Sequence, residues 1–367
     1  MALVQDTTEI FNPLLEITTY AITNSTKESS DLCITPEGIG WLTEYQPVYM
    51  WIIFVLGFIE NLIVICVYLL HKSRSTVAEI YLANLAAADL LLVCSLPIWA
   101  LTISNSFTWV FGSFLCVVVN AQAQINMYAS IYFLLMVSID RFLALVKTMS
   151  SGRMRGTGCA KLNCLIIWIF AVLMSIPKVA FRVVTYVEQF NTTMCLTNAG
   201  PEWHVASNFQ LNIVGFLIPI IGIAYCTLQI MNVLRNNSMQ KFKEFNTEKK
   251  ATVLIFTVLL LFIVCWLPFH IFTFLDTLDI LEVFPKCALS NFFEIGNQIS
   301  TYIAYSNSCI NPLLYVLVGN HFRKKTMEVY RQLTSRRHRE RNFSIPTDFS
   351  ADTIRTSISM GTQNRIF

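Results

Sequence analysis

Seven long apolar stretches dominate this sequence and limit the folds open to it. They lie at 48–70, 77–103, 116–146, 162–181, 207–234, 251–275 and 292–318. A bilayer core about 30 Å thick is crossed by a helix of about 20 mostly apolar residues. In lipid only helices and closed barrels satisfy their own backbone hydrogen bonds, and the alternating pattern of a barrel is absent here. We therefore predict an all-α membrane protein, a bundle of seven transmembrane helices.

The composition excludes several other classes of protein. Charged residues make up 13% of the chain, whereas about 25% is typical of soluble proteins. Hydrophobic residues reach 54%, and the formal net charge is only +3. A charge that small does not predict a nucleic-acid partner. The sequence has no nucleophile paired with a base and no cluster with metal-ligand spacing, so we expect neither an enzyme nor a resident cofactor.

The positions of lysine and arginine predict the orientation of the bundle. Cytoplasmic loops of membrane proteins carry an excess of these residues. Here two, four, five and ten of them lie, in that order, in segments 71–76, 147–161, 235–250 and 319–367. We therefore expect the N-terminus outside the cell and the C-terminus in the cytoplasm. No signal-peptide pattern is visible at the start, so we expect the first span to direct insertion.

Four regions follow from this pattern. Residues 1–47 form an outer segment, and residues 48–318 form the seven-helix bundle. Residues 319–334 are expected to form a short amphipathic helix on the membrane surface, with an apolar stripe at Phe322, Val329, Tyr330 and Leu333. Residues 335–367 are expected to be a disordered cytoplasmic tail.

Candidate modification sites divide between the two sides of the membrane. The glycosylation sequons at Asn24 and Asn191 fall outside, where glycosylation takes place. The tail carries candidate phosphorylation sites at Ser344, Ser350, Thr353, Thr356, Ser357 and Ser359. A phosphate adds negative charge for a basic partner, although tails rich in serine and threonine are also often simply disordered.

Four of the eleven cysteines lie on the oxidising outer side: Cys33, Cys116, Cys195 and Cys287. Four cysteines permit three pairings, and the sequence alone leaves them open. A bridge between Cys116 and Cys195 would hold the loop after the fourth span over the bundle. Cys33 is either bridged to Cys287 or free.

Polar side chains lie deep within the spans, where burial in lipid is costly. Asp89 is in the middle of the second span, and other polar groups lie at similar depth: Asn61, Asn126, Ser130, Asn307, Ser308 and Asn311. Two interpretations remain open. The oxygens of Asp89, Asn126, Ser130, Asn307 and Asn311 would suit a sodium ion, or the same groups form a polar network that holds helices together.

A charged pair, Asp140 and Arg141, ends the third span at the cytoplasmic face. It either anchors the helix end by reaching the interface or exchanges partners, with Glu248 holding Arg141 in a closed state. Pro268 and Pro312 are expected to kink the sixth and seventh helices. Kinks together with a breakable ion pair indicate a helix that swings, although proline is also common in rigid membrane helices.

The outer side of the bundle is acidic, which favours a cationic ligand. Helical spacing places Phe269, Thr273 and Asp276 on one face of the sixth span. The same spacing defines one face of the seventh span, made of Glu294, Gln298, Thr301 and Tyr305. A floor for a ligand cavity is predicted from Trp99, Trp266, Phe269 and Tyr305. The alternatives are a solvated acidic rim and an ordinary aromatic core.

One set of motifs occurs in a fixed order along the spans: Asn61, Asp89, Asp140-Arg141-Phe142, Trp168, Pro219, Cys265-Trp266-Leu267-Pro268 and Asn311-Pro312-Leu313-Leu314-Tyr315. This ordered set resembles the rhodopsin-like (class A) G-protein-coupled receptors. The chain departs from the usual pattern of that family at three positions. Glu60 stands in place of glycine, and Phe142 and Thr227 each stand in place of tyrosine.

Longer segments narrow the resemblance to the kinin (bradykinin) receptors, type 2 more than type 1: 77–89, 152–156, 239–244, 274–278 and 304–312. The resemblance implies a plasma-membrane receptor for a cationic kinin peptide that activates a heterotrimeric G protein through phospholipase C and calcium. It also implies arrestin and receptor-kinase partners at the tail, and contact with membrane lipid. The alternatives are a receptor for another peptide, such as an angiotensin-like ligand, and a membrane transporter.

The resemblance also assigns roles to residues. It implies the two disulfides Cys116–Cys195 and Cys33–Cys287 and a sodium ion at Asp89. It further implies an activation switch that involves Asp140, Arg141, Glu248, Trp266, Pro268, Pro312 and Tyr315.

Kinins begin and end with arginine, which gives the ligand residues their expected roles. Asp276 and Glu294 would hold the first arginine, and Arg182, taken as the one cation beside the cavity, would receive the terminal carboxylate. Gln124, one turn from Asn120, stands where type 1 kinin receptors carry lysine. Because Gln124 has no charge, the receptor is expected to accept a ligand that keeps its last arginine.

Overall fold

The computed structural model describes residues 40–71, 75–146, 156–236, 242–285, 289–317 and 320–343. The predicted sites at Cys33, Cys287, Asn24 and the six tail phosphorylation sites lie outside these residues. Some side chains within the helices are also outside the described part, among them those of Glu248, Glu294 and Tyr315.

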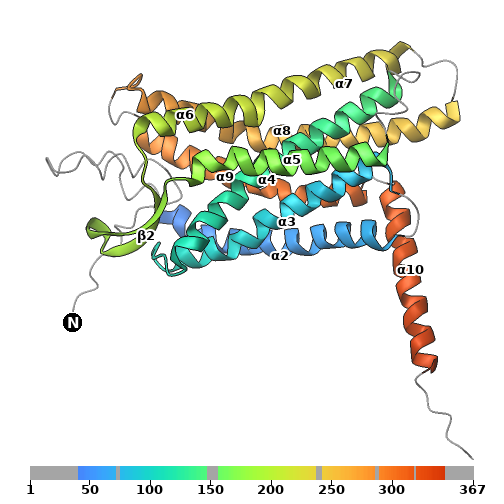
Figure 1. Ribbon diagram of the computed structural model, residues 1–367, viewed down its shortest axis with the longest axis horizontal. Coiled ribbons are helices and arrows are strands. Elements are labelled where there is room, and N and C mark those ends of the chain that lie inside the picture. The colour runs from blue at the N-terminus through green and yellow to red at the C-terminus, as the bar shows by residue number, and fades with distance from the viewer. Residues whose placement is uncertain are drawn as a thin grey trace, which may run out of the picture.

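The described chain is an α-helical bundle. Its helices are α2 (Gly40–Leu70), α3 (Val77–Ser104), α4 (Gly112–Leu145), α5 (Thr157–Val179), α6 (Pro201–Asn212), α7 (Ile218–Asn236), α8 (Phe242–Ile280), α9 (Ser290–Leu317) and α10 (Asn320–Phe343). Figure 1 shows α2 to α9 running along the long axis of the molecule, with α10 turned away from that axis at one end. The predicted all-α fold is confirmed.

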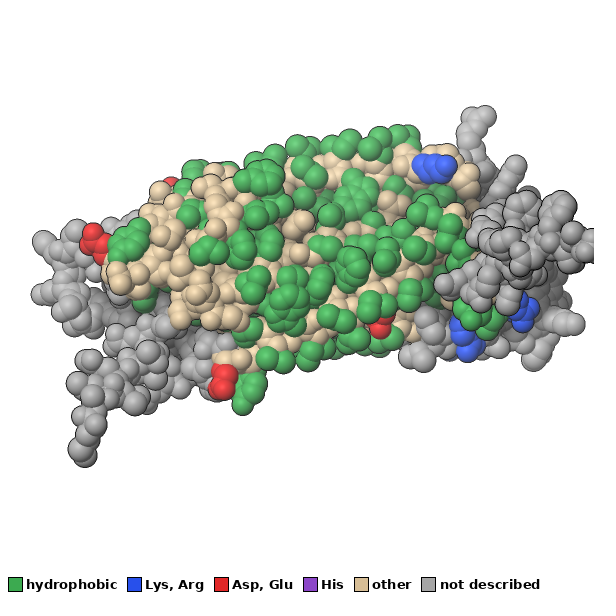
Figure 2. Space-filling model, turned by 90° about the horizontal axis from the view of Figure 1, so that it is seen from below, with side chains coloured by type: hydrophobic (Ala, Val, Ile, Leu, Met, Phe, Trp, Pro, Cys, Tyr) green, Lys and Arg blue, Asp and Glu red, His purple; other side chains and the backbone are tan. Residues whose placement is uncertain are grey.

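Six helical segments of the described chain are long and apolar enough to cross a membrane: 44–70, 77–104, 112–145, 157–179, 201–233 and 256–280. The seventh span is α9, with 28 residues. Its inward face is polar, with buried Asn297, Gln298, Asn307 and Asn311. Figure 2 shows hydrophobic side chains over the middle of one face, and the lysine and arginine side chains in view lie at one end. Both features fit a bundle that crosses a bilayer.

Several helices extend beyond the apolar stretches that predicted them. The first predicted span begins at residue 48, but α2 already begins at Gly40. The sixth was predicted from residue 251, but α8 begins at Phe242 and ends at Ile280. Hydropathy marks only the part of a helix that lies in lipid, whereas a helix continues into water wherever its residues favour it.

The fifth span is interrupted by a π-helical turn, η3 (Ile213–Leu217), between α6 and α7. A π turn breaks the regular hydrogen-bond ladder, so some backbone groups need other partners. The hydroxyl of Tyr132 on α4 donates to the carbonyl of Val214 at 3.1 Å. The same irregular region follows Asn208, which faces the cavity described below.

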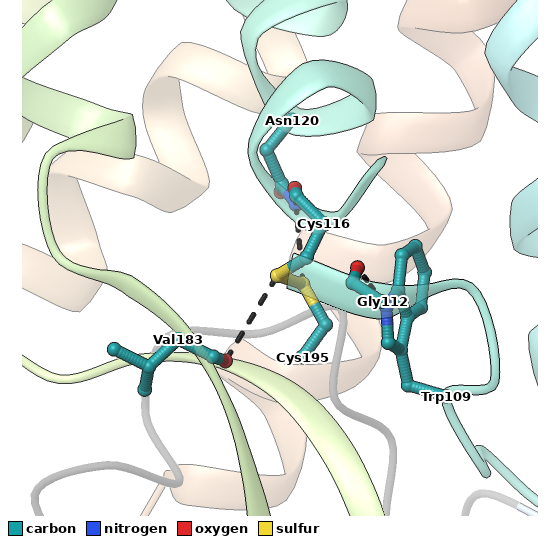
Figure 3. Close-up of a disulfide and its surroundings, with 6 residues drawn as sticks. All are labelled: Trp109, Gly112, Cys116, Asn120, Val183 and Cys195. Carbon is teal, nitrogen blue, oxygen red and sulfur yellow. Dashed lines mark hydrogen bonds between the residues drawn. A yellow bond between two sulfur atoms is a disulfide. The ribbon is translucent and has the colours of Figure 1, made fainter. Parts of the chain in front are cut away.

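The loop after α5 is a β-hairpin, an element that was not predicted. Strands β1 (Arg182–Val187) and β2 (Thr192–Thr197) pair antiparallel, and both are rich in β-branched residues. Figure 3 shows Cys195 of β2 bonded to Cys116 of α4, with Asn120 beside the bridge. The predicted Cys116–Cys195 disulfide is confirmed, and it attaches the hairpin to one end of the bundle, near the start of α4.

An ion pair and a histidine–carboxylate contact attach α10 to the opposite end. The Lys325 ammonium lies 2.7 Å from the Glu79 carboxylate at the start of α3, and both side chains are buried. Glu79 also accepts a hydrogen bond from the backbone N–H of Thr76. His71 lies 2.8 Å from Glu328. The helix continues to Phe343, beyond the end predicted at residue 334, through a run of arginine and glutamate that favours helix.

Replacing Lys325 with methionine should destabilise the protein by about 3 kcal/mol, because the buried Glu79 carboxylate would lose its counterion. The measurement is the temperature at which the detergent-solubilised protein unfolds. Lys324→Met is the matched control, since Lys324 is exposed on the same helix and should leave that temperature nearly unchanged. The Glu79→Gln/Lys325→Met double variant should lose less than the sum of the single variants. If the Lys325→Met and Lys324→Met variants unfolded at the same temperature, the ion pair between Lys325 and Glu79 would not stabilise the protein.

Candidate functional site

A cavity of about 1020 Å³, including its open mouth, lies between the helices toward the end that carries the hairpin. Residues from α3, α4, α5, β1, α6, α8 and α9 line it, so it gathers side chains from most of the sequence. Nine of the ten predicted ligand residues line this cavity: Trp99, Asn120, Gln124, Arg182, Trp266, Phe269, Asp276, Gln298 and Tyr305. For the tenth, Glu294, the structure gives a place in α9 but no description of the side chain.

Aromatic side chains line much of the cavity. Trp266 and Phe269 of α8 meet edge to face, with ring centroids 5.8 Å apart. Trp99 packs against Trp109 at 5.6 Å, and Tyr305 comes from α9. Edge-to-face pairs of this kind add to the stability gained by burial alone. The four residues predicted to form a floor therefore share the cavity, as their helical spacing suggested.

The cavity is lined by one more cation than the sequence predicted. Arg182 was expected to be the one cation beside the cavity, but Lys178 at the end of α5 lines it as well. The Lys178 ammonium donates to Oδ1 of Asn208 at 2.9 Å. Nδ2 of Asn208 in turn donates to Oδ2 of Asp276 at 3.3 Å. The sequence signal for Lys178 is its position near the end of the fourth apolar stretch, 162–181.

Gln298 belongs to a contact between the first and last spans. Nε2 of Gln46 on α2 donates to Oε1 of Gln298 on α9 at 2.6 Å, and both side chains are buried. Nearby, the Tyr49 hydroxyl donates to the backbone carbonyl of Tyr302 at 2.7 Å. These bonds close the bundle beside the cavity and hold Gln298 against α2.

Below the cavity, the Asp89 carboxylate is completely buried within a polar network. Its Oδ1 accepts from Nδ2 of Asn126 at 3.0 Å and from the hydroxyl of Ser308 at 2.9 Å. Its Oδ2 accepts from Nδ2 of Asn311 at 3.1 Å. Asn126 also donates to the Ser130 hydroxyl at 3.3 Å. The network joins α3, α4 and α9.

Two members of this region differ from the predicted sodium set. Ser308 bonds directly to Asp89, although the prediction did not include it in that set. Among the described residues, buried Asn307 makes no hydrogen bond to Asp89, and neither its Oδ1 nor the Oδ1 of Asn311 has a partner. Asn311 also bonds to Asp89 through its Nδ2. A buried carboxylate with acceptor oxygens nearby fits a hard cation such as sodium.

At the end of the bundle opposite the hairpin, Arg141 lies 3.2 Å from its neighbour Asp140. Pro268 and Pro312 lie inside α8 and α9, as predicted. The side chains of Glu248 and Tyr315 are outside the described part, so the proposed Arg141–Glu248 contact remains a prediction. Asn191 lies in the exposed turn between β1 and β2, where its sequon is accessible.

Comparison with known proteins identifies the class. The family model "7 transmembrane receptor (rhodopsin family)" matches residues 60–315. The chain therefore belongs to the rhodopsin family of seven-transmembrane receptors, which are receptors rather than enzymes.

Within that family the chain is similar to the bradykinin receptors. It is 51% identical over 353 residues to the B2 bradykinin receptor of Homo sapiens, covering 95% of this chain and 90% of that protein. It is 52% identical to the B2 bradykinin receptor of Cavia porcellus, covering 93% and 92%. Identity to the B1 bradykinin receptor of Homo sapiens is 38%, covering 82% and 86%. The predicted closer resemblance to type 2 is confirmed.

Proposed function

We propose that this chain is a plasma-membrane receptor that binds a cationic kinin peptide in the outer cavity and activates a heterotrimeric G protein. The observation that carries the proposal is a cavity with Asp276, Lys178, Arg182 and an aromatic lining in a chain half identical to B2 bradykinin receptors. A peptide with charged ends and an apolar middle complements such a cavity. The N-terminus faces outward and the tail faces the cytoplasm.

The two ends of the peptide lie against residues of opposite charge, acidic at the first arginine and basic at the terminal carboxylate. Asp276, only 5% exposed, receives the guanidinium of the first arginine together with Glu294. Arg182 receives the terminal carboxylate by a bidentate pair. Trp99, Trp266, Phe269 and Tyr305 contact the apolar middle of the peptide.

Ligand binding changes the packing around Trp266 and so the position of α8 below Pro268. Trp266 is buried and stacks on Phe262 of the same helix, with ring centroids 5.8 Å apart. The movement continues through Pro312 and Tyr315 to the Asp140–Arg141 pair, where Glu248 restrains Arg141 in the inactive state. Released Arg141 contacts the G protein, which signals through phospholipase C and calcium.

The cytoplasmic and outer segments carry regulation and maturation. Phosphorylation of the tail by a receptor kinase recruits arrestin, and α10 lies on membrane lipid. The first 47 residues are tethered by a Cys33–Cys287 disulfide, and Asn24 and Asn191 carry glycans.

The Asp89 network binds sodium in the inactive receptor. Asp89, Ser130 and Ser308 supply oxygens, and Asn126 donates its Nδ2 to Asp89 and to Ser130. The buried Oδ1 atoms of Asn307 and Asn311, which have no hydrogen-bond partner among the described residues, complete the site. Closer approach of the helices on activation would leave less room for an ion, so agonist and sodium oppose each other.

The direct test is a calcium assay on cells that express the chain, dosed with kinins and, in parallel, with angiotensins. A response to kinins at lower concentration than to angiotensins is expected. A response to angiotensin alone would replace the kinin assignment with another peptide, and no response to either would contradict the proposal.

Neutralising Asp276 or Glu294 should weaken kinin binding by about 1–3 kcal/mol each, because a partly desolvated charge would lose its partner. Competition binding on Asp276→Asn, Glu294→Gln and the double variant gives the three values. The double variant should lose less than the sum, since both acids share one cation. Strict additivity, or no loss, would contradict a shared site.

Sodium should lower agonist affinity in the wild-type receptor but not in Asp89→Asn, which removes the formal charge of the network. Agonist competition curves with sodium, and with an impermeant organic cation at equal ionic strength, measure the effect. If the sodium dependence persists in Asp89→Asn, the ion binds elsewhere.

Replacing Gln124 with lysine should weaken binding of a full-length kinin more than binding of the peptide that lacks its last arginine. The new charge repels a terminal guanidinium and attracts the carboxylate of the shortened peptide. Dissociation constants of both peptides on both receptors provide the measurement. An equal loss for the two peptides would make Gln124 a packing residue.

A further inference from the structure

Three polar side chains connect α5, α6 and α8 beside the mouth of the cavity. Lys178 donates to Oδ1 of Asn208 at 2.9 Å, and Nδ2 of Asn208 donates to Oδ2 of Asp276 at 3.3 Å. All three residues line the cavity. They come from 178, 208 and 276 in the sequence, so only the fold brings them together.

The chemistry of Lys178 and Asp276 fixes the orientation of the side-chain amide of Asn208, which lies between them. An ammonium group has only donors, and an ionised carboxylate has only acceptors. Asn208 therefore turns its carbonyl oxygen to Lys178 and its amide nitrogen to Asp276. If the amide were reversed, its NH₂ group would face the Lys178 ammonium, and its carbonyl oxygen would face the Asp276 carboxylate. Asn208 thus links a positive and a negative charge through one polarised group.

Burial makes this link important for Asp276. The side chains of Asn208 and Asp276 are 1% and 5% exposed, so little water reaches the carboxylate. A buried carboxylate requires hydrogen bonds and nearby positive charge. Asn208 supplies a hydrogen bond, and Lys178 supplies positive charge one amide group away.

We propose that Lys178 and Asn208 form a counter-charge relay, in which the positive charge of Lys178 acts on Asp276 through the amide of Asn208. The relay stabilises the Asp276 carboxylate before ligand binds. It also limits how strongly the cavity prefers a guanidinium to a neutral group at the first position of the peptide. The inference rests on the proposed function, in which Asp276 receives the first arginine of the peptide. A guanidinium arriving at Asp276 competes with Asn208 for the carboxylate and is repelled by Lys178. Lys178 is then a specificity-determining residue of the ligand site.

Loss of the Lys178 charge should change the selectivity of the cavity for a cationic ligand in one direction only. Removing the charge of Lys178 leaves Asp276 less stabilised in the empty receptor and removes repulsion in the complex. Both effects favour a cationic ligand over a neutral one of the same shape. The receptor should therefore become more selective for arginine at the first position when it loses Lys178.

The experiment compares two peptides on each receptor: a kinin with arginine at position one, and the same peptide with citrulline, the neutral isostere of arginine. Lys178→Met removes the charge and keeps a long side chain, while Lys178→Arg keeps the charge. Lys178→Met should widen the ratio of the citrulline to the arginine dissociation constant by about three- to tenfold. Lys178→Arg should leave that ratio within a factor of about two of wild type.

An unchanged or narrower ratio in Lys178→Met would overturn the relay. Lys178→Gln provides the same comparison if the methionine variant does not reach the cell surface. Asp276→Asn separates the two proposals, because it should lower the ratio, with Glu294 still favouring arginine, and should make the ratio insensitive to the loss of Lys178. A wild-type ratio that survives Asp276→Asn would show that the assignment of the first arginine to Asp276 has failed.

Discussion

The buried carboxylate of Asp89 is the group on which the centre of this receptor depends. It accepts hydrogen bonds from Asn126 on α4 and from Ser308 and Asn311 on α9, while it belongs to α3 itself. Asn61 extends the contact to α2 by donating to the backbone of Ser308 at 2.7 Å. In lipid there is no hydrophobic driving force between helices, so polar contacts of this kind contribute to their association.

The outer half of the bundle uses a different arrangement. The Cys116–Cys195 disulfide joins α4 to the β-hairpin, and Arg182 begins the first strand of that hairpin. The hairpin therefore brings a cation to the rim of a cavity whose lower lining is aromatic. The relay from Lys178 to Asp276 adds a second connection across the same rim. Charge at the mouth and aromatic rings below together define the shape and polarity of a ligand.

The inner end combines a rigid attachment with a region suited to change. Lys325 and Glu79 form a buried ion pair that ties α10 to α3, whereas Pro268 inside α8 has no backbone N–H to donate within its helix. The Asp140–Arg141 contact is between neighbours on one helix, and the proposed activation exchanges it for another partner. The proposed movement of the sixth span therefore concerns α8, while the ion pair holds α10 to α3.

The sequence by itself determined the number of spans, the placement of Asp89 within one of them and the inward faces of the sixth and seventh helices. These follow from local rules, because length sets membrane crossing and a period of 3.6 residues sets a helix face. Tertiary structure decided the β-hairpin and the pairing of Lys178 with Asn208. It also decided that Ser308 contacts Asp89 while Asn307 does not. Those contacts depend on how separate helices rotate and approach one another, and helical spacing within one segment does not fix that rotation.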